Sequence, residues 1–412
     1  MEPLLFDAVV FDLDGTLVAT DSFWLVAAER GARRAFAELG LARELPTAAE
    51  WMGMVGLPLA QGIANTFGDL DEAQRDRVLQ RCVEETHAAL QAGGAALLDG
   101  ALELLRELAA RGIQLGIASN CSQAYLDAML RDLRLGEFVR EARCLQSPGI
   151  ASKSEMLADL LLTFVTRSAV MVGDRASDGA AARANGLPFV HIASGFAPAS
   201  EVIPSDATIH SLRELVPQLQ RRARWISDEL DALLAHGRTL GISGRSGSGK
   251  SLFARDAARV LRARGVAAEV IAFDAFLRPE NARVATPHAA ADHLAHAFDL
   301  ALLEDAVLAP RRRGASTRAG PWGSAVPAGA VLLVEGLFLA DPRIAGSLDA
   351  LAMLEAPTSV LQARLRAREP LPAVRERFLE RFLPAQAAFD ARPGLRSPTR
   401  RIPAANPLGP HP

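Results

Sequence analysis

Short apolar runs alternate with longer amphipathic segments along most of this chain. Runs of about five residues rich in Val, Ile and Leu predict buried strands, and apolar positions three and four apart predict helices. The clearest strands are expected at residues 7–12, 113–118, 169–173 and 187–192. The clearest helices are expected at residues 21–40, 72–92, 99–111, 122–133 and 153–163. This alternation predicts an α/β fold whose parallel sheets are covered by helices on both faces.

The alternation of strands and helices is interrupted once, near residues 221–237, and then resumes. Residues 206–220 predict one more short strand and helix, and 221–237 predict a charged connecting helix. Further strands are expected at 239–243, 266–273 and 331–335. We therefore expect two doubly wound parallel-sheet domains, at residues 1–220 and 238–392, joined by the linker helix 221–237. Residues 393–412 are rich in proline and lack periodicity, which predicts a disordered tail.

Composition narrows the possible functions. The 412 residues carry a net charge of −3, which gives no general attraction to nucleic acid or to an anionic membrane. Cys82, Cys121 and Cys144 have no metal-like spacing and cannot all pair, which favours a reducing compartment. No apolar run reaches the roughly 18 residues of a membrane span, and the first residues lack a signal-peptide pattern. A cytoplasmic location is expected.

The first candidate site follows the first predicted strand, in FDLDGTLVAT at residues 11–20. Asp12 and Asp14 are two residues apart, so at the end of a strand both side chains leave on the same side. Two adjacent carboxylates favour a divalent cation, and one of them can attack phosphorus while the other holds a proton. Gly15 permits a sharp turn, and Thr16 offers a hydroxyl and an amide to a phosphate oxygen.

Three further pieces follow in order along the chain. Ser119 and Asn120 end the strand 113–118, and Lys153 opens a predicted helix. Asp174 follows the strand 169–173, and Asp178 is four residues further on, on the same face of a helical turn. Each piece alone is common as a cap, a turn or a solvated charge. Their order after the D-x-D-G-T motif is what makes the set informative.

Together these motifs resemble the haloacid dehalogenase superfamily of phosphatases and mutases, over roughly residues 5–215. The resemblance implies that Asp12 forms an aspartyl-phosphate and that Asp14 acts as general acid and then as base. It implies catalytic help from Lys153 and phosphate binding by Thr16, Ser119 and Asn120. It implies Mg²⁺ binding by Asp12, Asp14, Asp174 and Asp178, the last as a ligand or behind the ligands.

Residues 18–98 lie between the first two motifs and are mostly helical in pattern. They are similar to the helical cap of the phosphoglycolate phosphatase and β-phosphoglucomutase relatives. Such a cap closes over small phosphorylated metabolites and excludes water, which argues against a macromolecular substrate. The segment WMGMVGLPL at 51–59 is the expected specificity element, although its residues do not name a ligand.

A second candidate site lies at GRSGSGKS, which satisfies the phosphate-loop pattern G-x-x-x-x-G-K-[ST] between a predicted strand and a predicted helix. Its glycines let backbone amides converge on phosphate oxygens, its lysine adds charge, and its serine can bind Mg²⁺. The expected nucleotide-binding residues are Gly244, Arg245, Ser246, Gly247, Ser248, Gly249, Lys250 and Ser251.

From about residue 238 to 390 the chain resembles the uridine kinase, phosphoribulokinase and pantothenate kinase group. The resemblance implies that Asp274 orients or deprotonates the acceptor hydroxyl, that Glu335 serves the metal, and that Arg364 and Arg368 of a lid helix clamp the nucleotide's phosphate. A strand-end cap for Asp274 and a solvated face for the arginines are the ordinary alternatives. An acceptor segment at Asp292, His293 and Asp299, and an anion-binding loop at Arg311–Arg313 and Arg318, remain open in the same way.

We therefore expect a bifunctional enzyme that acts on small metabolites. One domain hydrolyses a phosphomonoester with Mg²⁺, and the other transfers phosphate from ATP to a hydroxyl of a sugar, nucleoside or similar compound. One alternative is a polynucleotide kinase-phosphatase, which the cap and the mild acidity oppose. Another is a phosphatase with a phosphate-loop domain that only senses nucleotide.

Overall fold

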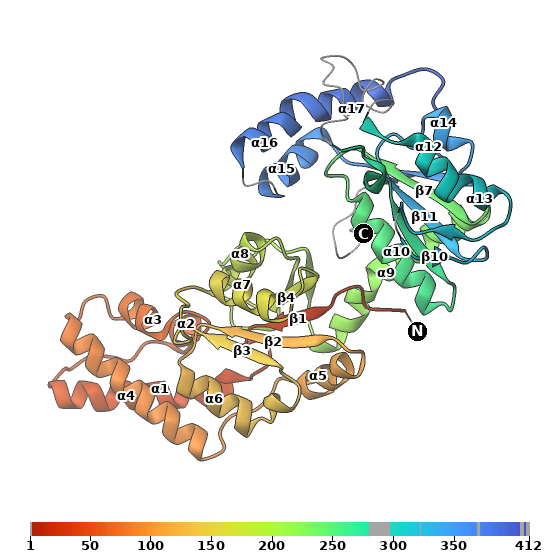
Figure 1. Cartoon of the computed structure of the whole chain (residues 1–412). Coiled ribbons are helices and arrows are strands. Elements are labelled where there is room, and N and C mark those ends of the chain that lie inside the picture. Colours follow the sequence, from red (N-terminus) through yellow and green to blue (C-terminus); the bar gives the residue numbers. More distant parts are fainter. Residues whose placement is uncertain (1, 280–296, 322, 369–370, 404–407, 409–412) are drawn as a thin grey trace. The chain divides into compact units, whose positions relative to one another are not determined.

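The computed structural model describes residues 2–279, 297–321, 323–368, 371–403 and 408. The chain forms two compact units, one of Phe6–Leu219 and one of Met1–Leu5 together with Gln220–Pro412 (Figure 1). Each unit contains a parallel sheet with helices around it, so the predicted α/β fold class is confirmed. No helix in the described part of the chain is both long and apolar enough to cross a membrane.

The unit Phe6–Leu219 is built on a six-stranded sheet with the order β3-β2-β1-β4-β5-β6, in which all neighbours are parallel. Its strands are β1 (Ala8–Phe11), β2 (Gln114–Ser119), β3 (Glu141–Cys144), β4 (Ala169–Gly173), β5 (Phe189–Ile192) and β6 (Ala207–Ile209). Helices α7 (Lys153–Thr163) and α8 (Ala176–Ala184) cover one face, and α5 (Ala101–Ala110) and α6 (Gln123–Asp132) cover the other (Figure 1). The strand order reverses at β1, which places a ligand crevice at the carboxyl ends of β1 and β4.

Four helices form the cap between β1 and α5. They are α1 (Trp24–Leu39), α2 (Ala48–Met54), α3 (Leu59–Thr66) and α4 (Glu72–Gln91). The helices predicted at 21–40 and 72–92 are confirmed, whereas α2 and α3 are new. Gly31 lets α1 approach α4 closely, because a Cβ at this position would lie 2.5 Å from the Cα of Cys82. The two long helices of the cap therefore pack backbone against backbone.

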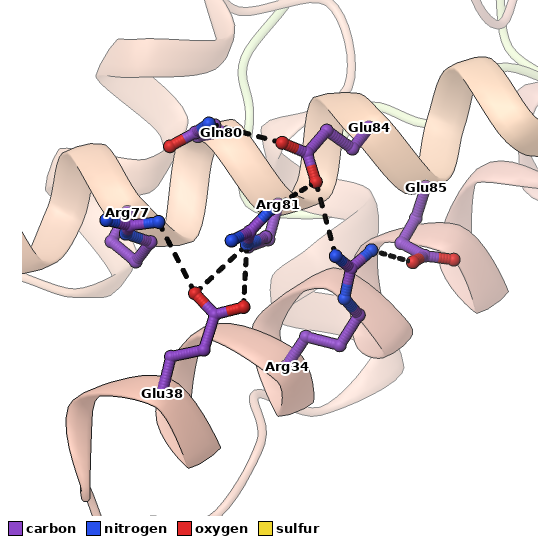
Figure 2. A network of polar contacts seen from close by, with 7 residues as sticks. All are labelled: Arg34, Glu38, Arg77, Gln80, Arg81, Glu84 and Glu85. Atoms are coloured by element: carbon purple, nitrogen blue, oxygen red, sulfur yellow. Dashed lines mark hydrogen bonds and ion pairs between the residues drawn. The ribbon is translucent and has the colours of Figure 1, made fainter.

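The polar faces of α1 and α4 also form a network of ion pairs (Figure 2). Arg34 of α1 pairs with Glu84 and Glu85 of α4, and Glu38 of α1 accepts from Arg77 and Arg81. These side chains are partly exposed to solvent, so each pair contributes little to stability. The position of these arginines matters more than their contribution to stability. The network holds Arg77 and Arg81 on the outer side of the cap.

The second unit is built on a five-stranded parallel sheet with the order β13-β12-β7-β11-β8. Its strands are β7 (Thr239–Gly244), β8 (Ala268–Ala272), β11 (Val331–Gly336), β12 (Ala350–Glu355) and β13 (Arg400–Pro403), beside a short antiparallel pair, β9 (Thr317–Arg318) and β10 (Ala325–Val326). Its helices are α9 (Leu215–Leu234), α10 (Lys250–Ala263), α12 (Leu300–Leu303), α13 (Ala309–Arg312), α14 (Pro342–Ala345), α15 (Thr358–Arg368), α16 (Pro372–Glu376) and α17 (Leu383–Asp390). The second parallel sheet is thereby confirmed.

The expectation of a disordered tail at 393–412 is wrong for its central part. Strand β13 pairs in parallel with β12, Ile402 is buried in the core, and Arg400 forms an ion pair with Glu229 at 2.7 Å. Proline is tolerated here because β13 is an edge strand, where an N–H can be spared. One buried isoleucine among prolines and arginines gives too weak a pattern for a strand to be recognised.

The expected boundary at residue 1 also differs from the structure. Residues before Phe6 belong to the second unit, where Leu5 is buried among Ala223, Ile226 and neighbouring core residues. The guanidinium of Arg259 donates to the carbonyl oxygens of Leu4 and Leu5 at 3.3 and 3.1 Å. The chain therefore starts in one unit, forms the other as an insertion, and returns to the first.

Candidate active site

The carboxyl edge of the first sheet brings together residues from four parts of the chain. Asp12 directly follows β1 and Asp174 directly follows β4, and these strands are paired neighbours in the sheet. Lys153 opens α7, and Asp178 lies in the first turn of α8. The ammonium of Lys153 lies 2.9 Å from Oδ1 of Asp12 and 2.6 Å from Oδ1 of Asp178. All four side chains are buried.

Three of these residues form an acidic cluster that suits a cation. One carboxylate oxygen from each of Asp12, Asp174 and Asp178 lies within 4.8 Å of the others. Oδ2 of Asp12 and Oδ1 of Asp174 are buried and have no hydrogen-bond partner. Three carboxylates and one ammonium leave two negative charges, which a divalent cation offsets. The donor set therefore fits Mg²⁺, which prefers carboxylate oxygens.

Asp178 has a different position in this cluster. Its Oδ1 accepts from Lys153, and its Oδ2 accepts from the backbone N–H of Arg175 at 3.0 Å. Because both of its oxygens already have partners, Asp178 is best placed to hold Lys153 and the turn after β4. Asp12 and Asp174 each keep one buried oxygen without a hydrogen-bond partner.

Burial sets the protonation of the cluster. Burial raises the pKa of Asp12 well above its usual value, with Lys153 opposing the shift and the other two carboxylates adding to it. Burial and the charge of Asp178 raise the pKa of Asp174 to about 7. Burial opposes the charge of Lys153, yet the attraction of Asp12 and Asp178 raises its pKa. The buried carboxylates thus repel one another, which destabilises the folded unit, and a bound cation reduces this repulsion.

Mg²⁺ is expected to stabilise the protein against heat through this cluster. A cation present at about 100 times its Kd adds about 2.7 kcal/mol, which raises the Tm of a domain of this size by several degrees. Differential scanning calorimetry with Mg²⁺ and with EDTA measures the shift. Asp174→Asn should lose most of it, and Asp132→Asn at the exposed end of α6 should keep it. An equal shift in Asp174→Asn would place the cation elsewhere.

Asp14 lies outside this acidic cluster. Its Oδ1 accepts from the hydroxyls of Thr20 and Tyr125, both at 2.6 Å. The expectation that Asp12 and Asp14 point the same way rested on strand alternation, but β1 ends at Phe11 and a turn follows. Burial raises the pKa of Asp14, and the two hydroxyl donors oppose the shift. Its carboxylate is thus oriented separately from that of Asp12, as suits a different role.

Two of the predicted phosphate-binding residues are buried beside Asp12. Oγ1 of Thr16 has no hydrogen-bond partner, and Ser119 ends β2 at the same edge of the sheet. A buried hydroxyl without a partner costs free energy, which a ligand oxygen can recover. Both residues lie where the sequence places them, and their role in phosphate binding stays a prediction.

The third, Asn120, contacts the cap. Its Nδ2 donates to the carbonyl oxygen of Gly56 at 2.9 Å. The guanidinium of Arg175 donates to the carbonyl oxygens of Gly53 and Val55, and it pairs with Glu201 at 2.9 Å. The two side chains together hold three carbonyl oxygens of the segment 51–59. Sequence reasoning missed Arg175, although its place directly after Asp174 put it at the same edge.

A cavity of about 340 Å³ opens beside Asp14 and under the cap. It is large enough for a small metabolite. Its walls come from the loop after α2 and from α1, α4, α6 and the loop after β3. The lining residues are Asp14, Thr20, Trp24, Met54, Val55, Gly56, Leu57, Pro58, Leu59, Ala60, Leu79, Val83, Thr86, His87, Ser119, Asn120, Cys121, Ser122, Tyr125, Leu145 and Gln146.

The carboxyl edge of the second sheet brings together the other predicted residues. The loop after β7 leads into α10, which begins at Lys250. Oγ of Ser251 donates to Oε1 of Glu335, at the end of β11, at 3.1 Å. Burial raises the pKa of Glu335, which Ser251 and Lys250 oppose, and the charge of Asp274 adds to the rise. Asp274 is exposed in a short turn after β8, so these groups share one edge.

The loop itself has the backbone that its glycines allow. Gly247 and Gly249 have φ angles of 84° and 91°, which favour glycine. The guanidinium of Arg364 in α15 donates to the carbonyl oxygen of Gly247 at 3.2 Å, and burial lowers its pKa. Oε1 of Gln386 in α17 accepts from the N–H of Ser246 at 2.8 Å. Arg364 thus contacts the loop, and its role at a phosphate stays a prediction.

Other expectations for this unit meet different outcomes. Asp299 caps α12, because its Oδ1 accepts from the N–H of Leu302 at 3.0 Å, which is the ordinary role of such a residue. Asp292 and His293 lie outside the described residues, as does the side chain of Arg368.

Arg311 and Arg312 of the arginine-rich segment have structural partners, and the anion-binding role of Arg313 and Arg318 stays a prediction. Arg311 donates to Thr239 Oγ1 and to the carbonyl oxygens of Ala328 and Ala330, near the amino ends of β7 and β11. Arg312 pairs with Glu304. Arg311 therefore binds the edge of the sheet that is opposite to residues 244–251. Its guanidinium is neither a solvated charge nor part of an anion-binding site.

Comparison with known proteins identifies the first unit. The sequence model of the haloacid dehalogenase-like hydrolases matches residues 9–192. A phosphoglycolate phosphatase from Rhodospirillum rubrum is 32% identical over 201 residues, which are 46% of this chain and 80% of the relative. Another, from Pseudomonas syringae pv. tomato, is 28% identical over 227 residues, 51% of this chain and 78% of the relative. A solved haloacid dehalogenase-like hydrolase from Streptococcus pneumoniae is 24% identical, with a TM-score of 0.45, covering 52% of this chain and 98% of that one.

The resemblance expected over residues 5–215 is therefore confirmed at the level of the family for residues 9–192. The match runs from β1 to β5 and so includes Asp12, Lys153 and the Asp174–Asp178 turn. It ends before the second unit and does not bear on the phosphate loop. With this site geometry, and with a relative 32% identical over four fifths of its own length, the chain belongs to the haloacid dehalogenase-like hydrolase family.

Proposed function

We propose that the first unit hydrolyses small phosphomonoesters through a phosphate ester of Asp12. The observation that supports this most directly is Oδ2 of Asp12, which is buried and has no hydrogen-bond partner, while Oδ1 of the same carboxylate accepts from Lys153. A carboxylate oxygen without a partner, fixed at its other oxygen by Lys153, is a suitable nucleophile for phosphorus. A bound Mg²⁺ would supply charge neutralisation for the phosphoryl oxygens.

Asp14 is placed to move the proton. In the first step Oδ2 of Asp12 bonds to phosphorus, the ester bond breaks, and the leaving alkoxide takes a proton from Asp14. In the second step Asp14 removes a proton from water, and the water oxygen bonds to phosphorus as the bond to Asp12 breaks. The raised pKa of Asp14 suits this role, because a group that both gives and takes a proton works best near the ambient pH.

The cavity supports a small substrate. Its volume of about 340 Å³ suits a metabolite, and the cap segment 51–59 forms part of its wall. The names of the curated relatives make 2-phosphoglycolate one of the esters that should be tested. Phosphate release from a panel of phosphomonoesters, with Mg²⁺ and with EDTA, tests the proposal. No Mg²⁺-dependent release from any ester would contradict it.

We further propose that the second unit binds Mg-ATP at residues 244–251 and phosphorylates a hydroxyl group. In support, the loop lies between β7 and α10, and Ser251 and Glu335 form a polar pair where a Mg²⁺ would bind. Lys250 begins α10 beside the loop, Arg364 contacts it, and Asp274 lies exposed at the same edge. The acceptor is expected to be a sugar, a nucleoside or a similar compound.

Lys250→Ala should weaken ATP binding at least about 100-fold, because the ammonium is the charge that meets the β and γ phosphates. Isothermal titration with Mg-ATP measures the effect, and Arg313→Ala serves as a control at the opposite edge. Unchanged affinity in Lys250→Ala would remove ATP from this loop. ATP binding without phosphorylation of any compound in a metabolite panel would instead indicate a nucleotide sensor.

A further inference from the structure

The cavity under the cap has an unusual charge for a site that takes phosphate esters. Among the described residues that line it, none is lysine or arginine, and Asp14 is the one acid. Most of the lining is apolar, with Trp24, Met54, Leu79 and Val83 among the contributors. A second anionic group on the substrate would therefore be buried without a cation and beside the carboxylate of Asp14, which is costly.

Two buried cations of the active-site region, Lys153 and Arg175, already have partners. Lys153 is bound between Asp12 and Asp178, on the side of the phosphoryl group. Arg175 is 5% exposed and contacts carbonyl oxygens of the cap and Glu201. Both would have to leave buried partners before they could reach a second anion.

Two arginines of α4 lie on the face away from the cavity. Positions 79, 83, 86 and 87 line the cavity and share one helical face. Arg77 and Arg81 lie on the other face, where they bind Glu38 in the network of Figure 2. The part of α4 that lines the cavity, from Leu79 to His87, thus carries neutral side chains inward and Arg81 outward.

From these observations, and resting on the proposed phosphatase function, we propose that the alcohol part of the substrate is uncharged and largely apolar. Thr86, His87 and Gln146 offer it hydrogen-bonding groups among the lining residues. The site is thereby selective against phosphomonoesters that carry a carboxylate or a second phosphate. His87 is the one described lining side chain that can become positive, and the test includes it.

The test compares two isosteric esters, 2-phosphoglycolate and its carboxamide, 2-phosphoglycolamide. Values of kcat/KM are measured for the full chain with Mg²⁺, with butyl phosphate and p-nitrophenyl phosphate as further neutral esters. The neutral esters should exceed 2-phosphoglycolate by at least about 100-fold. A value for 2-phosphoglycolate equal to or above that of the carboxamide overturns the proposal. If no ester is hydrolysed, the phosphatase function itself has failed, which is a different result.

A pair of variants tests the charge argument directly. Val83→Arg puts a cation on the inner face of α4 and should raise the ratio of carboxylate to carboxamide activity at least about tenfold. Ala88→Arg puts the same cation at an exposed position on the face of Arg77 and Arg81 and should leave the ratio unchanged. An equal change in both variants would mean that the inner face does not contact the substrate.

The histidine is tested separately. His87→Leu should keep the preference for the neutral ester, whatever it does to the rate. If the wild type prefers the carboxylate and His87→Leu loses that preference, the proposal is overturned and anion recognition belongs to His87.

Discussion

Asp12→Asn should abolish phosphoester hydrolysis and leave the protein at least as stable as the wild type. A carboxamide does not attack phosphorus, so kcat should fall by about 10⁴-fold or more. Stability should not fall, because burial and the neighbouring carboxylates raise the pKa of Asp12 and so favour its uncharged form. An amide has the same shape and carries no charge. Phosphate release with p-nitrophenyl phosphate and a Tm by calorimetry without Mg²⁺ measure the two effects.

This combination separates loss of chemistry from loss of fold. A variant that loses activity because it unfolds would show a lower Tm. Asp7→Asn, just before β1, serves as a control outside the acidic cluster and should keep its activity. Activity within tenfold of the wild type in Asp12→Asn would remove Asp12 as the nucleophile.

Lys153→Met should remove activity and also destabilise the first unit by about 3–5 kcal/mol. Lys153 is 6% exposed and joins Asp12 to Asp178, so its loss leaves buried carboxylates without a countercharge. Calorimetry in EDTA measures the loss as a lower Tm of the unit Phe6–Leu219. Mg²⁺ should restore part of it, because the cation compensates the same charges.

A double variant tests the physical cause of this loss. Lys153→Met with Asp178→Asn removes one carboxylate along with the ammonium and should recover much of the stability but none of the activity. If the double variant is as unstable as the sum of its single changes, charge imbalance is not the cause. Lys153→Arg should retain stability, because it keeps the positive charge.

Parts of the active site could be predicted because each residue stands next to a strong local signal. Asp12 and Asp174 follow apolar runs that can only be buried strands, and Lys153 begins a helix with a regular apolar pattern. In a parallel sheet all such strand ends meet at one edge, so the positions in sequence imply proximity. These residues could therefore be grouped from local sequence patterns, without any knowledge of long-range contacts.

Other parts depend on contacts that local patterns do not contain. Tyr125 reaches Asp14 across 111 residues of chain, and Arg175 reaches the cap loop across 120. A tyrosine in the first turn of a helix, or an arginine just before a helix, is common, and nothing beside it in sequence names its partner. The one signal was position, since both follow strands that end at the site.

The missed elements share a physical reason as well. Strand β3 is four residues long, and of these only Cys144 is buried, so its pattern resembles a loop. Helices α2 and α3 have seven and eight residues, too few for periodicity to stand out. The capping box of Thr47 and Glu50 was the usable signal for α2, because a threonine followed three residues later by glutamate is typical of a helix start.

The insertion of Phe6–Leu219 between residue 5 and residue 220 has a consequence for folding. The second unit needs both ends of this insertion at once, since Gln220 donates to the carbonyl oxygen of Glu2 at 3.0 Å. Closing an unfolded loop of that length costs on the order of 5 kcal/mol in chain entropy. Once the inserted unit has folded, its two ends are held in place. The second unit can then fold without paying this entropy. Each folded unit thus reduces the loss of chain entropy when the other one folds. A substitution that unfolds the first unit should therefore destabilise the second, although the substituted residue makes no contact there.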